Sequence, residues 1–162
     1  MGPFRSIITE AWEKTFILTK FFCFLHVTDT YLINHVMTYG PSMLPAIDLS
    51  PTDFLAERIS TRFGKLAQGD IVVLRNPQNP RKTVTKRLVG LEGDTITYVS
   101  SSENSDMHET VVVPKGHVWV QGDNTYNSND SRHFGPVPYG LIESKLFWRV
   151  WPLEDFGPFW KK

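Results

Sequence analysis

Residues 70–99 read DIVVLRNPQNPRKTVTKRLVGLEGDTITYV, and this stretch indicates the fold of most of the chain. It holds three short runs rich in β-branched residues, which predict strands over Asp70–Arg75, Thr83–Val89 and Thr95–Val99. Asn-Pro steps separate the first two runs, and Glu92-Gly93-Asp94 separates the last two. Because no helical period lies between the runs, the pattern is typical of neighbouring antiparallel strands rather than of βαβ units.

The same pattern continues from about Met37 to the end of the chain. Further strands are predicted over Phe54–Ser60, Thr110–Val113, His117–Gln121 and Lys145–Trp151. Residues 100–109 are mostly polar and predict a hairpin tip. Several short strands separated by turn residues predict an antiparallel barrel or coiled sheet. We therefore assign residues 37–162 to one β-rich domain.

A different composition marks residues 15–36, for which we predict one helix, with residues 1–14 as an N-terminal tail. Apolar and aromatic side chains dominate the helix, and its core contains no Gly or Pro. A bilayer span needs about 20 mostly apolar residues, but Lys20, His26 and Asp29 interrupt this one. A membrane anchor and an amphipathic helix lying on a membrane or on the domain both remain open. A secretory signal fits less well, because no small-residue cleavage site follows.

Length and charge limit the classes of function. With 162 residues and 18.6 kDa the chain has room for one compact domain. Lys and Arg total 17 and Asp and Glu total 17, so the chain lacks the cationic field that nucleic-acid binding requires. The single cysteine, Cys23, excludes an intrachain disulfide and a cysteine-based zinc site.

The segment Gly40-Pro41-Ser42-Met43-Leu44-Pro45 is the first candidate for chemistry. It is either a plain turn between helix and sheet, or a rigid stretch that presents the Ser42 hydroxyl beside backbone amides. A serine nucleophile needs a base, and histidine is the usual one. A Ser-His-Asp triad has no positive support, because none of the five histidines has a known nucleophile or metal-ligand spacing: His26, His35, His108, His117 and His133.

Lys86 offers another base. Alternate side chains of a strand share a face, so Lys86 lies with Val84 and Leu88 while Arg87 lies on the opposite face. If the strand is exposed, Lys86 and Arg87 are a solvated pair. If the aliphatic face is buried, desolvation lowers the pKa of Lys86, and the neutral amine can accept a proton from a serine.

The polar segment 121–132 is the third candidate. It is either a loop held by side-chain hydrogen bonds to its own backbone, or a support for the site. In the second case it supplies a carboxylate for Arg87, hydroxyls near a catalytic amine, and an Asp130–Arg132 pair that fixes the loop.

Taken together and in this order, these segments resemble the type I signal peptidase family. The resemblance extends from about Tyr39 to Pro152, and it implies an antiparallel β catalytic domain with one N-terminal helix. The brief loop between the lysine motif and Gly122-Asp123-Asn124 favours the organellar type. The motifs that carry it are Gly40–Pro45, Gly69–Val73, Lys86–Asp94, Gly122–Asn124, Asn127–Arg132 and Phe134–Val137.

The resemblance implies a Ser-Lys dyad in which Ser42 is the nucleophile and Lys86 the general base. Met43 would line the substrate groove and keep water from the amine. Many bacterial members carry a serine oxyanion donor two residues before the nucleophile, whereas Gly40 stands here, which leaves the Ser42 N–H as the clearest donor. The remaining implied roles are catalytic support: Ser128 orienting the amine, Asp123 pairing with Arg87, and Asp130 with Arg132.

The function implied is that of a membrane-bound serine endopeptidase. It would remove sorting sequences from precursors exported across the mitochondrial inner membrane, with its catalytic domain facing the intermembrane space. Its partners would be precursor polypeptides, the lipid membrane and a related second subunit, and it would need no cofactor or metal. The alternatives are a bacterial or plastid signal peptidase, a Ser-Lys autoproteolytic domain of the repressor-cleaving kind, and an inactive scaffold subunit.

Overall fold

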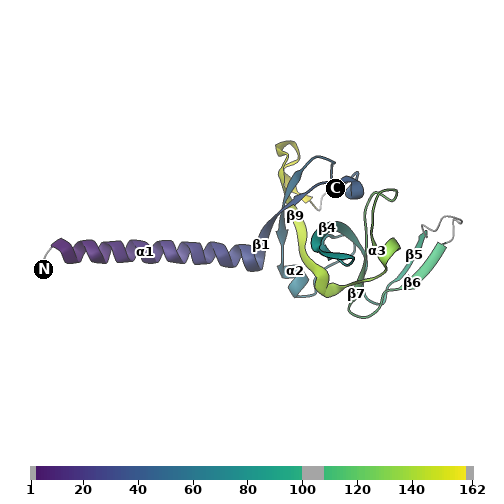
Figure 1. The fold of residues 1–162 in the computed structure, drawn as a ribbon, viewed down its shortest axis with the longest axis horizontal. Coiled ribbons are helices and arrows are strands. Elements are labelled where there is room, and N and C mark those ends of the chain that lie inside the picture. The colour runs from purple at the N-terminus through teal and green to yellow at the C-terminus, as the bar shows by residue number, and fades with distance from the viewer. Residues whose placement is uncertain (1–2, 100–107, 160–162) are drawn as a thin grey trace.

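The computed structural model describes residues 3–99 and 108–159. A single long helix, α1 (Pro3–Val27), projects from a domain built of coiled β-strands (Figure 1). One π-helical turn, Thr28–Leu32, joins the helix to the first strand, β1 (Ile33–Thr38). The chain therefore consists of one isolated helix and one β domain.

The helix differs from the predicted 15–36 at both ends. It begins at Pro3, so most of the predicted tail is helical, and it ends at Val27. A Lys14–Glu10 ion pair at 2.7 Å, with the spacing that suits a helix, supports its first half. The alternating residues of 33–38 instead pair with another strand, from Ile33 opposite Glu57 to Thr38 opposite Thr52. Pairing with a distant strand makes this segment extended, although its own composition predicted a helix.

Among the described residues, nothing in the β domain covers α1 between Ile7 and Val27. Every side chain from Ile7 to Val27 is exposed, including Trp12 at 72% and Phe24 at 66%. Within the part of the chain that the structure describes, no helix combines the length and hydropathy that crossing a bilayer requires.

Eight strands form one antiparallel sheet in the order β1-β2-β9-β3-β4-β7-β8, with β10 paired to β9. Two further strands, β5 (Thr95–Val99) and β6 (His108–Val112), form a separate ribbon. The predicted hairpin tip between them falls mostly outside the described residues. The other bounds are β2 (Thr52–Glu57), β3 (Ile71–Asn76), β4 (Asn79–Gly90), β7 (His117–Gln121), β8 (Val137–Pro138), β9 (Ile142–Trp151) and β10 (Gly157–Pro158).

The ends of the predicted strands agree with those of the observed strands to within a few residues, and two of the differences have a clear physical cause. The strand predicted over Phe54–Ser60 stops at Glu57, where its carboxylate accepts a hydrogen bond from the Ser60 N–H and a short helix, α2 (Ile59–Arg62), begins. The strand predicted over Thr83–Val89 is β4, which begins four residues earlier, at Asn79, because a tight turn joins β3 directly to β4. The other short helix, α3, spans Ser131–Phe134.

Coiling of the sheet creates two hydrophobic cores. Along β3 the side chains alternate between them: Val72 and Leu74 pack with Leu88, while Ile71 and Val73 pack with Met43. The second core therefore holds the segment around residue 43 against the sheet.

Candidate functional site

The Ser42 segment forms one 3-10 turn, Pro41–Met43, anchored by the buried Met43 side chain. The turn is entered through Gly40, whose φ of 109° lies in a region that other residues reach only under strain. A serine side chain at position 40 would therefore strain the backbone of this chain.

Residues more than 80 positions along the chain hold this turn in place. The backbone N–H of Asn124 donates to the Ser42 carbonyl at 3.1 Å, and its side-chain amide donates to the Pro41 carbonyl at 3.1 Å. A Cβ on Gly122 would lie 2.4 Å from the Ser42 carbonyl oxygen and 2.2 Å from the Ser128 hydroxyl, so only glycine fits there. Gly122 and Asn124 belong to the motif Gly122–Asn124, but the sequence alone predicted no role for either residue.

Lys86 is buried, with 3% of its surface exposed. It lies opposite Val72 in the β3–β4 pairing, on the face where Leu88 enters the first core. Burial lowers the pKa of Lys86 from 10.5 to about 8, against the opposing charge of Asp130, and the nearby Arg132 adds to the lowering. Of the two alternatives left by the sequence, the buried amine is therefore the one the structure contains.

Two ion pairs lie near this amine, and three of their members act on its charge: Asp130, Arg132 and Asp123. Arg87 donates to Asp123 from Nε at 2.7 Å and from Nη2 at 2.6 Å. Arg132 donates to Asp130 from Nε at 2.9 Å and from Nη2 at 2.6 Å. Burial alone would raise the pKa of Asp130, but the hydrogen bonds from Arg132, from the Gly122 N–H and from the Ser128 hydroxyl lower it to about 2. The Asp130 carboxyl group is therefore ionised at neutral pH, and its charge acts on the Lys86 amine.

Ser128, expected to orient the amine, lies in the same buried cluster. Its hydroxyl helps to lower the pKa of the Asp130 carboxyl, whereas no hydrogen bond between the Ser128 hydroxyl and the Lys86 amine is found among the described residues. The Ser128 oxygen lies beside Gly122, close to the position that a Cβ there would occupy.

A sequence of contacts connects the lysine with the nucleophile turn. The Asp130 charge acts on Lys86, and the Asp130 carboxylate accepts a hydrogen bond from the Gly122 N–H at 2.8 Å. Gly122 in turn touches the Ser42 carbonyl. The three candidate segments of the sequence therefore meet in one region of the fold.

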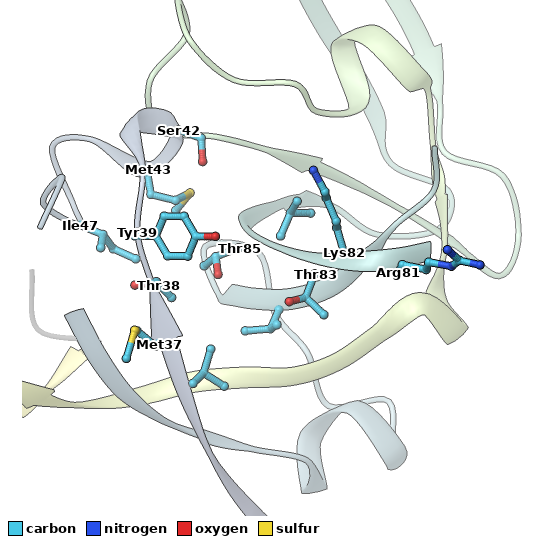
Figure 2. Close-up of a pocket in the computed structure, with 14 residues that line it drawn as sticks. Met37, Thr38, Tyr39, Ser42, Met43, Ile47, Arg81, Lys82, Thr83 and Thr85 are labelled. Atoms are coloured by element: carbon cyan, nitrogen blue, oxygen red, sulfur yellow. The ribbon is translucent and has the colours of Figure 1, made fainter. Parts of the chain in front are cut away.

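Ser42 opens on a cavity of about 440 Å³. Its two walls are the 36–43 segment on one side and residues 81–85 of β4 on the other, with the Ser42 hydroxyl directed into the space between them (Figure 2). Gly40 and Met43 line the same cavity, whereas no histidine is found among its described lining residues.

Both walls carry unpaired strand edges. β1 pairs on one side only, with β2, and is the end of the sheet. β4 pairs with β3 along Thr83–Arg87, but β7 joins its other side only from Arg87 onward. Within the described part of the chain, no strand pairs with this edge of β4 before Arg87, so its backbone N–H and C=O groups can pair with an extended peptide.

The chain matches the family described as signal peptidase, peptidase S26, over residues 10–104 and 99–151. It is 56% identical over 149 residues to the mitochondrial ATP-independent inner membrane protease subunit 1b of Arabidopsis thaliana, covering 92% of this chain and 88% of that protein. To subunit 1a of the same plant it is 53% identical over 157 residues, covering 97% and 94%. To the human mitochondrial inner membrane protease subunit 1 it is 45% identical over 153 residues, covering 94% and 90%.

Proposed function

Because this chain belongs to the signal peptidase family, peptidase S26, we propose that it is the catalytic subunit of a mitochondrial inner membrane protease that cleaves sorting sequences from precursor proteins. The observation that carries the proposal is the buried amine of Lys86, with a pKa near 8, in the region of the Ser42 turn. An ordinary exposed lysine would remain charged at neutral pH and could not act as a base.

In the proposed mechanism neutral Lys86 accepts the proton of the Ser42 hydroxyl as its oxygen attacks the scissile carbonyl. The Ser42 N–H stabilises the oxyanion that forms, and protonated Lys86 returns its proton to the leaving amine. The acyl-enzyme is then hydrolysed by a water that Lys86 activates. One amine thus serves both half-reactions.

Asn124 supports this step as a positioning residue. Its side chain donates to the Pro41 carbonyl, which belongs to the same peptide unit as the Ser42 N–H. A hydrogen bond at the oxygen of a peptide unit polarises that unit and strengthens its N–H as a donor. This compensates in part for the side-chain donor that Gly40 lacks.

The substrate would be an extended peptide that adds between β1 and the free edge of β4. Backbone pairing with a strand edge gives affinity, and the cavity that Met43 and Gly40 line receives side chains near the scissile bond. This arrangement favours an unfolded segment of a precursor.

The exposed apolar and aromatic side chains of α1 suit association with the inner membrane, where its Lys14–Glu10 pair and Lys20 would stay near the polar surface. The β domain would then face the intermembrane space. A related second subunit is a further expected partner, because the similar proteins are named as subunits of a protease.

The test is cleavage of candidate precursors by the purified protein in detergent, with sequencing of the new N-termini. Ser42→Ala should abolish cleavage, while the matched change Ser50→Ala, at an exposed serine, should leave it intact. Labelling by a serine-directed penem separates an active subunit from an inactive scaffold. Loss of labelling in Ser42→Ala alone is expected, and equal activity of the two variants would refute the assignment of the nucleophile.

A further inference from the structure

A second cavity, of about 370 Å³, lies at the base of α1, and it shares no lining residue with the cavity at Ser42. It is formed by α2, the end of β3 and the start of β9. Its polar lining residues are Arg58, Thr61, Arg62, Arg75, Tyr139 and Glu143. Three arginines thus line one cavity.

The charges of these arginines are incompletely compensated. Glu143 accepts from Arg75 Nε at 2.7 Å. Among the residues that the structure describes, the Arg58 side chain donates to neutral oxygens only, the Thr30 carbonyl at 3.0 Å and the Asn34 side chain at 3.5 Å. Arg62 lies 4.8 Å from the centre of the Tyr31 ring. The nearby Glu57 accepts a hydrogen bond from the α2 backbone and holds the pKa of Tyr139 above its usual value, with burial as the larger cause.

The cavity is fixed to the point where α1 enters the domain. The Arg58 N–H donates to the Leu32 carbonyl at 2.8 Å, and Figure 1 shows α2 beside the α1–β1 junction. Large apolar side chains border the arginines on the outside, with Phe63 exposed at 72%, Tyr31 at 48% and Ile59 at 44%. Guanidinium donors beside exposed aromatic side chains suit the interfacial layer of a membrane, where phosphates lie above the acyl chains.

We propose that Arg58, Arg62 and Arg75 form a binding site for the phosphate of an anionic phospholipid, and that the site docks the β domain on the membrane beside α1. The inference rests on the proposed membrane association of α1 but not on the Ser-Lys mechanism. A planar guanidinium binds phosphate oxygens with two parallel hydrogen bonds, which favours a headgroup phosphate over a neutral lipid surface. Phe63 and Ile59 would enter the layer beneath it.

The test compares flotation of the full chain with vesicles of phosphatidylcholine alone and with vesicles containing one fifth cardiolipin. Each cation near an anionic surface contributes about 1 kcal/mol, or about fivefold in affinity. Arg62→Gln with Arg75→Gln should therefore weaken binding to the anionic vesicles about 30-fold and leave binding to neutral vesicles unchanged. Arg58 is left in place because it also holds the α1 junction. Lys115→Gln, at an exposed turn elsewhere, is the charge control.

Each other outcome overturns the proposal in a distinct way. An equal loss in Lys115→Gln means attraction to net charge without a site. Full competition by millimolar inorganic phosphate means a soluble phosphate site rather than a lipid site. Wild-type protein that binds both vesicles equally refutes this inference alone, whereas binding to neither also refutes the membrane role of α1. Peptide cleavage in detergent micelles should be the same in the wild type, the double arginine variant and Lys115→Gln, which separates this result from the proposed catalytic function.

Discussion

The ionisation of Lys86 should control both the activity and the stability of this protein. With a pKa near 8, roughly one amine in ten is neutral at pH 7, against about one in three thousand for a lysine at 10.5. We expect kcat/KM for a sorting-sequence peptide to rise about tenfold per pH unit below pH 8 and to level off above it. A profile that is flat between pH 6 and pH 9 would refute the assignment of this amine as the base.

The same shift makes a separate thermodynamic prediction. The folded-state pKa, about 8, lies below the 10.5 of the unfolded chain, so between these values the unfolded chain binds more protons. Stability therefore rises with pH across that window, and the cost of burying the cation is fully present below pH 8. Since one pKa unit corresponds to about 1.4 kcal/mol, the whole cost is about 3 kcal/mol.

Lys86→Met removes the charge and keeps the approximate length of the side chain. We measure the free energy of unfolding of both proteins in urea and take the variant's value minus the wild-type value. This difference should be about 3 kcal/mol larger at pH 7 than at pH 10.5, and it should fall between pH 8 and pH 10.5. The difference between the two proteins cancels the titration of all other groups. A difference that stays constant with pH would mean that Lys86 is not desolvated in the folded state.

Three further changes probe the support of the site. Gly122→Ala should lower kcat about 100-fold, because its Cβ displaces the Ser42 carbonyl and misplacement by about 1 Å has that cost; unchanged kcat in a folded variant would contradict the close contact. Asn124→Ala should lower kcat about fivefold with little effect on KM, as expected for loss of one hydrogen bond of about 1 kcal/mol, and steady-state kinetics separate the two constants. Arg132→Gln should cost about 3–5 kcal/mol in urea unfolding, since it leaves Asp130 charged and fully buried, and a loss below 1 kcal/mol would show that the pair is not needed.

Local patterns predicted the β domain well because a strand shows its faces in its own sequence. The alternation of Val84, Lys86 and Leu88 placed the lysine on an aliphatic face, and the structure buries that face. The end of the helix could not be found in this way. Residues 33–38 are extended because β2 pairs with them, and the sequence of the segment itself does not contain that information.

The support of the nucleophile was the least predictable part of the site. Asn124 and Gly122 act on the Ser42 turn through contacts between segments more than 75 positions apart, and a motif alone does not reveal which backbone it touches. The same limit explains Ser128. Its expected bond to the lysine depends on a side-chain direction that the motif does not determine, and here the hydroxyl lies beside Gly122 and acts on Asp130.

The incomplete pairing of β4 bears on how a protease in a crowded compartment spares properly folded proteins. Lys86 lies one residue before Arg87, where the pairing of β4 with β7 begins. A substrate chain can therefore extend the sheet at this point only if its own backbone N–H and C=O groups are unpaired. In a folded domain the backbone N–H and C=O groups already form hydrogen bonds within that domain, so they cannot pair with β4. The protease can thus distinguish an unfolded sorting sequence from the folded mature protein by its unpaired backbone, before any side chain is recognised.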